Sequence, residues 1–208
     1  PQLVQSLVIP IAFQTDRLLL SHLGASDALA QYNLASTLFN LLTQTVMVAG
    51  VAMWPLFARA RARGRVESPL GPALFFGAGG LVSGLGLAAL TPWAASVISD
   101  GRIHLPVTLI AAYLVYVVIE AAKQPLGMYM TDPRGLRFQV VPVLVLVPVN
   151  FALSWWLTAP LGAAGPILGS AVSVLVCQLV PYTWWVRRDV ARRRALDHPS
   201  PSHLEESL

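Results

Sequence analysis

The sequence predicts an all-α, polytopic membrane protein: a bundle of six transmembrane helices with both termini in the cytoplasm. Three observations support this fold class. Hydrophobic residues make up 55% of the 208 residues and charged residues only 12%, whereas a soluble domain has about 25% charged residues. The apolar residues fall into runs long enough to cross a bilayer. The basic residues concentrate in alternate loops between these runs.

Six segments contain ~20 or more mostly apolar residues, the length that a helix needs to cross the membrane. We expect spans at about 3–24, 31–57, 72–98, 105–130, 138–158 and 163–186. Together they form one domain, residues 1–186. Residues 187–208 follow as a basic and then polar cytoplasmic tail, which is too poor in apolar residues to pack a core and is expected to be disordered.

The arginines predict the orientation of the spans. They follow the second, fourth and sixth spans, whereas the alternate loops contain only Arg102. Loops rich in Lys and Arg stay in the cytoplasm, so we expect a multi-pass protein of the cytoplasmic membrane. The net charge of +4 arises from these short loops. It therefore indicates membrane topology and contact with membrane lipids, and nucleic acid is not expected as a partner.

The first expected span carries two charged residues, Asp16 and Arg17. An ionisable group inside a bilayer costs about 2.5 to 3.5 kcal/mol and needs a partner or a wet cavity. Neighbouring residues on a helix point about 100° apart, so these two do not pair well with each other. Arg17 could instead extend to the outer headgroups, but that alternative leaves Asp16 unexplained.

The second expected span contains a polar stripe. Asn33, Ser36 or Thr37, Asn40 and Gln44 recur at spacings of three and four, which places them along one side of a helix. Such residues often hydrogen-bond between membrane helices, and this explanation suffices for Ser36 and Thr37. The large amides of Asn40 and Gln44 leave two alternatives open, helix association and a water-filled cavity.

The fourth expected span repeats the pattern with charges. Its polar face includes Tyr113, Tyr116 and Glu120, followed one turn later by Lys123 or Gln124. Glu120 and Lys123 at i, i+3 can form an ion pair within the helix, and this pair could be purely structural. Intramembrane ionisable groups usually face the interior of a bundle or a solvent pathway, so we expect Glu120 to face a cavity. If the polar faces of spans one, two and four converge, they line one aqueous cavity.

The remaining spans indicate close packing rather than chemistry. Gly80 and Gly84 form a GxxxG in span three, and Gly165, Gly169 and Ser173 stand four apart in span six. No pair of Cys and His residues has metal-ligand spacing. The chain also contains no P-loop, GxSxG or HExxH motif, nor a nucleophile beside a base. We therefore expect neither an enzyme nor a metal or other cofactor.

Three stretches carry a resemblance to a known family: "DRLLLSHLGASDALAQYNLASTLFNLL", "VAMWPLFARARARG" and "NFALSWWLTAPLGAAGPILGSAVSVL". They resemble the carboxy-terminal half of polysaccharide and lipid-linked-oligosaccharide flippases of the multidrug/oligosaccharidyl-lipid/polysaccharide exporter superfamily. The likeness covers nearly all of residues 3–186. It depends on Asp16, Gly24, Tyr32, Pro55 with the basic loop, and the turn from Leu161 to Gly165.

The resemblance implies a transporter with two six-helix lobes around a polar cavity that opens alternately to each side of the membrane. It implies that Arg17 contacts an anionic headgroup, and that Asp16 or Glu120 organises this site or responds to a coupling proton or sodium ion. Only one lobe is present, so we expect a fragment or a truncated member, or a second copy that completes the cavity. The expected substrate-path residues are Asp16, Arg17, Tyr32, Asn33, Asn40, Gln44, Tyr113, Tyr116, Glu120, Lys123 and Gln124.

The expected function is therefore flipping of a lipid-linked oligosaccharide or polysaccharide precursor for the cell envelope. Two alternatives remain open. One is a cation-coupled multidrug exporter of the same superfamily, in which a buried acid exchanges a proton or sodium for a cationic substrate. The other is a non-transporting membrane scaffold, in which the buried polar pairs only fix the register of the helices.

Overall fold

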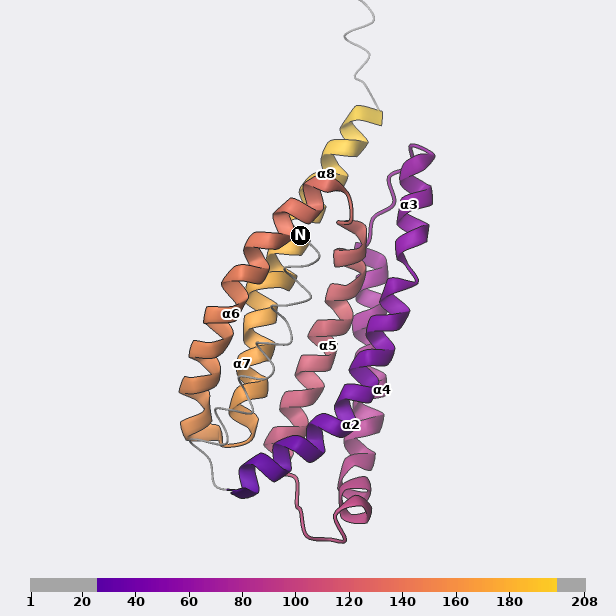
Figure 1. Cartoon of the computed structure of the whole chain (residues 1–208). Coiled ribbons are helices and arrows are strands. Elements are labelled where there is room, and N and C mark those ends of the chain that lie inside the picture. The colour runs from indigo at the N-terminus through magenta and orange to yellow at the C-terminus, as the bar shows by residue number, and fades with distance from the viewer. Residues whose placement is uncertain (1–25, 198–208) are drawn as a thin grey trace, which may run out of the picture.

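The computed structural model describes residues 26–197, which are helical apart from short connections and contain no strand (Figure 1). The predicted all-α fold class is confirmed over this range. The elements are α2 (Ser26–Val51), α3 (Trp54–Ala62), α4 (Leu70–Ile98), α5 (Val107–Tyr129), α6 (Pro133–Leu161), α7 (Ala164–Val174), the π-helical turn η1 (Leu175–Leu179) and α8 (Val180–Asp197).

Five helical segments are long and apolar enough to cross a membrane. They are residues 27–62, 70–98, 107–129, 133–161 and 164–195. Each corresponds to one of the five spans that the sequence predicts after residue 25. The predicted first span, 3–24, lies outside the described residues, and so do its two charged residues, Asp16 and Arg17.

The second predicted span, 31–57, is interrupted between α2 and α3. Pro55 is one of the first two residues of α3. Its nitrogen has no hydrogen to donate to the preceding turn, and its ring clashes with the carbonyl four residues earlier. The chain therefore leaves the α-helix at Ala52 and Met53, where the Met53 N–H donates to the Gly50 carbonyl at 3.0 Å. Of the basic residues that follow, Arg59 and Arg61 lie on the separate short helix α3, and Arg63 and Arg65 come after its end.

Helix α4 packs along α5 through its glycines. A β-carbon added to Gly80 would lie 2.8 Å from the Ala121 β-carbon, and one added to Gly84 would lie 2.5 Å from Leu114 Cδ1. The backbones can approach because neither glycine carries a side chain. The predicted close-packing face of span three is therefore confirmed.

The glycines of α7 serve the same purpose against α6. A β-carbon on Gly169 would lie 2.7 Å from the Ser154 nitrogen, and one on Gly165 would lie 2.5 Å from the Thr158 α-carbon. Unlike α4, α7 meets backbone atoms at both positions, which cannot move aside like the end of a side chain. The predicted close-packing face of span six is confirmed as well.

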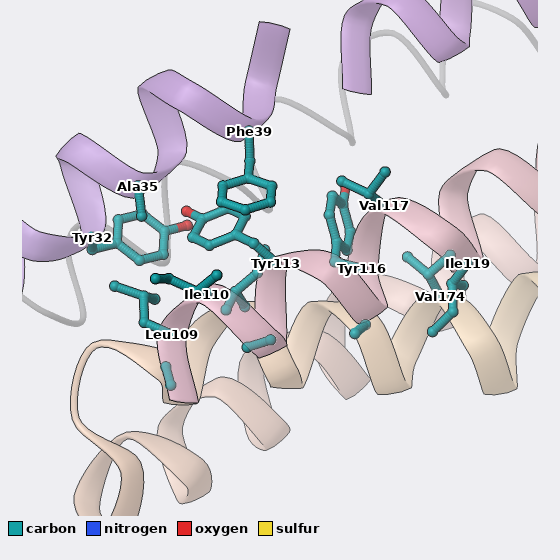
Figure 2. Close-up of a cluster of buried hydrophobic side chains, with 14 of the residues drawn as sticks. Tyr32, Ala35, Phe39, Leu109, Ile110, Tyr113, Tyr116, Val117, Ile119 and Val174 are labelled. Carbon is teal, nitrogen blue, oxygen red and sulfur yellow. The ribbon is translucent and has the colours of Figure 1, made fainter. Parts of the chain in front are cut away.

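Helix α5 lies at the centre of the larger core cluster and packs against α2 and α7. On the α2 side, Figure 2 shows Tyr32, Ala35 and Phe39 above Tyr113 of α5. The Phe39 and Tyr113 rings stack with centroids 5.1 Å apart. Tyr32, Ala35 and Phe39 thus form the inward face of α2.

The last helix continues beyond the predicted end of span six. Residues 187–197 belong to α8, although the sequence analysis places a disordered tail from residue 187. Two interactions explain the difference. Val186 and Val190 are buried against the bundle, and Asp189 pairs with Arg193 one turn later at 2.7 Å. Residues 198–208 lie outside the described part.

The arginine-rich segments gather at one end of the bundle, which we call the basic end. It comprises α3 with the connection that follows it, the first two turns of α6 and the last turns of α8 (Figure 1). Arg102 lies in the α4–α5 connection at the opposite end. The structure therefore brings the basic loops together as the alternating sequence pattern requires.

Candidate functional site

A cavity of about 280 Å³ lies among α2, α5, α6, α7 and the first turn of α8. Most of its wall is apolar, with contributions from Met47, Val143, Leu146, Val174 and Tyr182. Eight polar residues, apart from two tyrosines, also line it: Glu120, Lys123, Gln124, Thr131, Gln139, Asn150, Ser170 and Ser173. An apolar pocket with a few convergent polar groups is the usual form of a small-molecule site.

The charged part of the wall is an ion pair on α5. The Lys123 ammonium lies 2.7 Å from Glu120 Oε1, and the two side chains are 16% and 7% exposed. Lys123 also donates to Gln178 Oε1 at 2.9 Å. An ammonium has three N–H donors, and among the described residues these two bonds account for two of them. The ammonium lies in the cavity wall, and no described residue accepts its third N–H.

Gln178 reaches Lys123 because it lies in the π-helical turn η1. The Val180 N–H donates to the Leu175 carbonyl, five residues back. Pro181 explains this wider turn: it has no N–H for the Cys177 carbonyl, and its ring excludes that carbonyl from the usual α-helical position. Gln178 is buried, whereas the sequence analysis treats span six only as a packing surface. A glutamine within an apolar span, three residues before a proline, was the available signal.

Asn150 of α6 joins a buried polar network with α7. Its Oδ1 accepts from the Ser170 hydroxyl at 3.0 Å and from the Ser173 hydroxyl at 3.2 Å. The Ser173 hydroxyl is also 2.8 Å from the Gly169 carbonyl and 3.0 Å from the Ser170 carbonyl, so its single proton is shared among three acceptors. The network holds α6 and α7 together at the cavity wall. The sequence analysis did not include these residues in the site.

The cavity wall toward the basic end is held by Gln139. Its Nε2 donates to the Met130 carbonyl at 2.9 Å and more weakly to the Gly127 carbonyl at 3.4 Å. Carbonyls in the last turn of a helix lack partners within the helix, so this amide satisfies the end of α5. Asp132 similarly caps α6 by accepting from the Gly135 N–H at 3.1 Å.

Four of the predicted path residues line the cavity: Tyr116, Glu120, Lys123 and Gln124. All four come from α5, which supports the interpretation of that helix as cavity-facing. Tyr32 and Tyr113 are instead buried in the aromatic cluster between α2 and α5.

The expected convergence of the α2 stripe with the α5 face needs correction. Asn33, Asn40 and Gln44 are exposed and are not among the residues that line this cavity, although Met47, one turn after Gln44 on the same side of α2, does line it. The residues of α2 that turn inward are Tyr32, Ala35 and Phe39, a parallel stripe offset by one position. Burial of two aromatic rings stabilises the fold, whereas burial of amides costs free energy unless each amide finds a hydrogen-bond partner. Thr37 also lies on the exposed side, where its hydroxyl bonds the Asn33 carbonyl at 2.9 Å.

Together, the five apolar helices and the mainly apolar cavity with its few polar groups have the properties of a helical membrane protein. In the described residues no group of three or more His, Cys, Asp or Glu side chains is placed to hold a metal ion. Comparison with protein-family models, with curated proteins and with solved structures finds no match to this chain.

Proposed function

We propose that the chain is the carboxy-terminal six-helix lobe of a membrane transporter that flips lipid-linked oligosaccharide or polysaccharide precursors by alternating access. In this proposal both termini lie in the cytoplasm, and the protein belongs to the cytoplasmic membrane. Its partners are membrane lipids, the lipid-linked saccharide and a second six-helix lobe. The protein is not an enzyme and uses no cofactor, although transport can be coupled to a proton or sodium gradient.

The observation that carries the proposal is the Glu120–Lys123 ion pair in the cavity wall, together with the bond from Lys123 to Gln178. A buried ion pair recovers its desolvation penalty only with good geometry and further hydrogen bonds. The bond from Lys123 to Gln178 at 2.9 Å supplies one, and the remaining N–H supports a role in contacting a polar or anionic part of a substrate. Intramembrane ionisable groups that face a cavity generally mark a substrate or ion pathway.

The size of the cavity favours a partial rather than a complete binding site. Sites for small molecules usually occupy about 300–1,000 Å³, and this cavity has about 280 Å³. It accommodates a phosphate group or one sugar ring, not a whole lipid-linked headgroup. This fits a lobe that provides one half of a larger binding surface.

The exposed amide side chains of α2 support the proposal of a second lobe. Asn33, Asn40 and Gln44 are exposed on a helix that is long and apolar enough to span the membrane. Side-chain amides exposed to acyl chains lose their hydrogen bonds at a cost of several kcal/mol. A wet surface or a polar partner along this side of α2 removes that cost.

The proposal is tested with Lys123→Met in the full transporter, reconstituted in vesicles with a pyrophosphate-linked lipid saccharide. We expect transfer of the lipid between leaflets to fall at least tenfold, since the mutant loses the charged donor. Lys123→Arg is the matched control because it keeps the charge. Unchanged transfer by a folded Lys123→Met protein would overturn the assignment.

A cation-coupled multidrug exporter is the second candidate. It is favoured by one observation: Glu120 is a buried carboxylate in a mainly apolar cavity, as a site for a lipophilic cation requires. Glu120→Gln should then abolish drug efflux, whereas Lys123→Met should leave it intact or raise it. The flippase is supported instead if the parent protein shows no drug efflux and the Lys123→Met variant loses lipid transfer.

A membrane scaffold remains the third candidate because the Asn150 network links α6 and α7 as a purely structural device would. Single cysteines at Asn40, Gln44 and Glu120 distinguish it from a transporter. Labelling by a membrane-impermeant thiol reagent at these positions is expected for a pathway. No labelling under any transport condition would favour the scaffold.

A further inference from the structure

The basic end carries more positive charge than its own acids can neutralise. Asp132 and Asp189 both engage Arg193, at 3.6 Å and 2.7 Å. These two carboxylates are therefore already occupied by one arginine. The arginines that stay exposed at this end are Arg59, Arg63, Arg65, Arg134, Arg137, Arg187, Arg188, Arg192 and Arg194.

One part of this surface, between α6 and α8, combines arginine with aromatic rings. Phe138 of α6 stacks on Trp184 and Trp185 of α8, with ring centroids 6.5 Å and 6.0 Å apart. The Arg188 guanidinium lies 4.0 Å from the centroid of the Trp184 ring. Trp184 is 49% exposed, so the aromatic group is open to its surroundings rather than enclosed in the core.

The helix register places a second arginine in the same layer as Arg188. Arg134 precedes Phe138 by four residues on α6, and Arg188 follows Trp184 by four residues on α8. α6 begins at the basic end and α8 ends there (Figure 1). Both arginines are therefore one helical turn further out than the aromatic group. Both are exposed, and neither pairs with a carboxylate in the described part of the chain.

This order of groups matches the layers of a bilayer surface. Tryptophan rings settle at the level of the lipid headgroups, and a cation one turn further out is level with phosphate. The guanidinium group forms paired hydrogen bonds with phosphate oxygens. The stacking of Arg188 on Trp184 holds that guanidinium in place before a ligand arrives.

We propose that Trp184, Arg188 and Arg134 form a binding site for the headgroup of an anionic phospholipid. The phosphodiester lies between the two guanidinium groups, and the glycerol region and upper acyl chain cover the exposed Trp184 ring. A zwitterionic lipid binds less well because its own ammonium group opposes the arginines. An acidic peptide would meet the arginines but leave the Trp184 ring exposed at membrane depth. The site is separate from the central cavity and does not depend on the proposed transport activity.

The test is native mass spectrometry of the full chain released from nanodiscs that contain phosphatidylglycerol and phosphatidylcholine. The parent protein should retain phosphatidylglycerol in preference to phosphatidylcholine. Each of Arg188→Ala and Arg134→Ala should lower the apparent affinity about fivefold, the effect of one arginine near an anionic surface. The double variant should lose the preference, and Arg188→Lys should retain part of it.

Arg63→Ala is the matched control, since Arg63 is exposed at the same end but lies directly after α3. A loss of phosphatidylglycerol in Arg63→Ala equal to that in Arg188→Ala would overturn the site and indicate diffuse attraction to the basic end. Equal retention of both lipids by the parent protein would overturn it too. Trp184→Phe keeps a ring but weakens the contact with Arg188, so a folded Trp184→Phe protein should bind phosphatidylglycerol with intermediate affinity.

Discussion

The Lys123 ammonium on α5 donates to the Gln178 side-chain oxygen on η1 at 2.9 Å across 55 residues of sequence. This bond links the charged pair of one membrane-spanning helix to the irregular turn of another. It makes the charge at the cavity wall depend on the shape of the last span.

Replacement of Gln178 by Leu should destabilise the protein by about 1–3 kcal/mol, because a buried ammonium loses an acceptor. Thermal unfolding in detergent measures the change. Gln178→Glu is the matched control because it keeps an oxygen at the same position. A Leu variant that unfolds at the parent temperature would show that Lys123 finds another partner.

Removal of one member of the Glu120–Lys123 ion pair should lower the free energy of unfolding more than removal of both. Lys123→Met leaves the Glu120 carboxylate buried without its cation, at a cost of about 3–5 kcal/mol. Lys123→Met combined with Glu120→Gln should recover much of that loss. The four unfolding free energies form a double-mutant cycle. Additive effects would contradict coupling at the 2.7 Å separation.

Adjacent glycines on α4 offer an internal comparison of helix packing. Gly80→Ala places a methyl group 2.8 Å from the Ala121 β-carbon, whereas nothing lies within 4 Å of a β-carbon on Gly79. We expect Gly80→Ala to lower stability by about 1–3 kcal/mol through overpacking. Gly79→Ala should be neutral or slightly stabilising because Ala favours the helix. Equal unfolding temperatures would mean that α4 and α5 separate easily.

Arg193 should contribute far more to the stability of the basic end than its neighbour Arg192. Arg193→Ala leaves Asp132 and Asp189 without their shared cation, and their side chains are only 15% and 14% exposed. A loss of about 1–3 kcal/mol is expected for such partly buried charged hydrogen bonds. Arg192→Ala, at an exposed position with no ion pair, should change stability by less than about 0.5 kcal/mol. Similar losses in both variants would argue that general charge, not pairing, stabilises this end.

The sequence was sufficient to predict the spans after residue 25 and the glycine contacts of α4 and α7. In a membrane protein, long apolar runs form spanning helices, and small residues at spacings of four form close contacts between helices. The pairing of Glu120 with Lys123 followed from helix geometry alone.

The inward face of α2 could not be predicted in the same way. The stripes Asn33–Asn40–Gln44 and Tyr32–Ala35–Phe39 have the same helical period and differ by one position. Which one turns inward depends on the shape of α5 opposite, where Tyr113 stacks on Phe39. Gln178 was missed for a related reason, since its direction is set by the π-helical turn before Pro181 rather than by an α-helical period.

The π-helical turn also has a consequence for the whole last segment. A π turn amounts to one extra residue in an α-helix, so it shifts the angular phase of everything after it by about 100°. The Gly165–Gly169 side of α7 can therefore face α6 while Val186 and Val190 of α8 still face the bundle. The Tyr129 hydroxyl of α5 donates to Asp189 at 2.8 Å, and Arg193 pairs with Asp132. Deleting one residue from 175–179 would turn α8 about its axis and carry Asp189 and Arg193 away from these partners. Five residues in the middle of the last apolar segment thus set the rotational alignment of contacts several turns away.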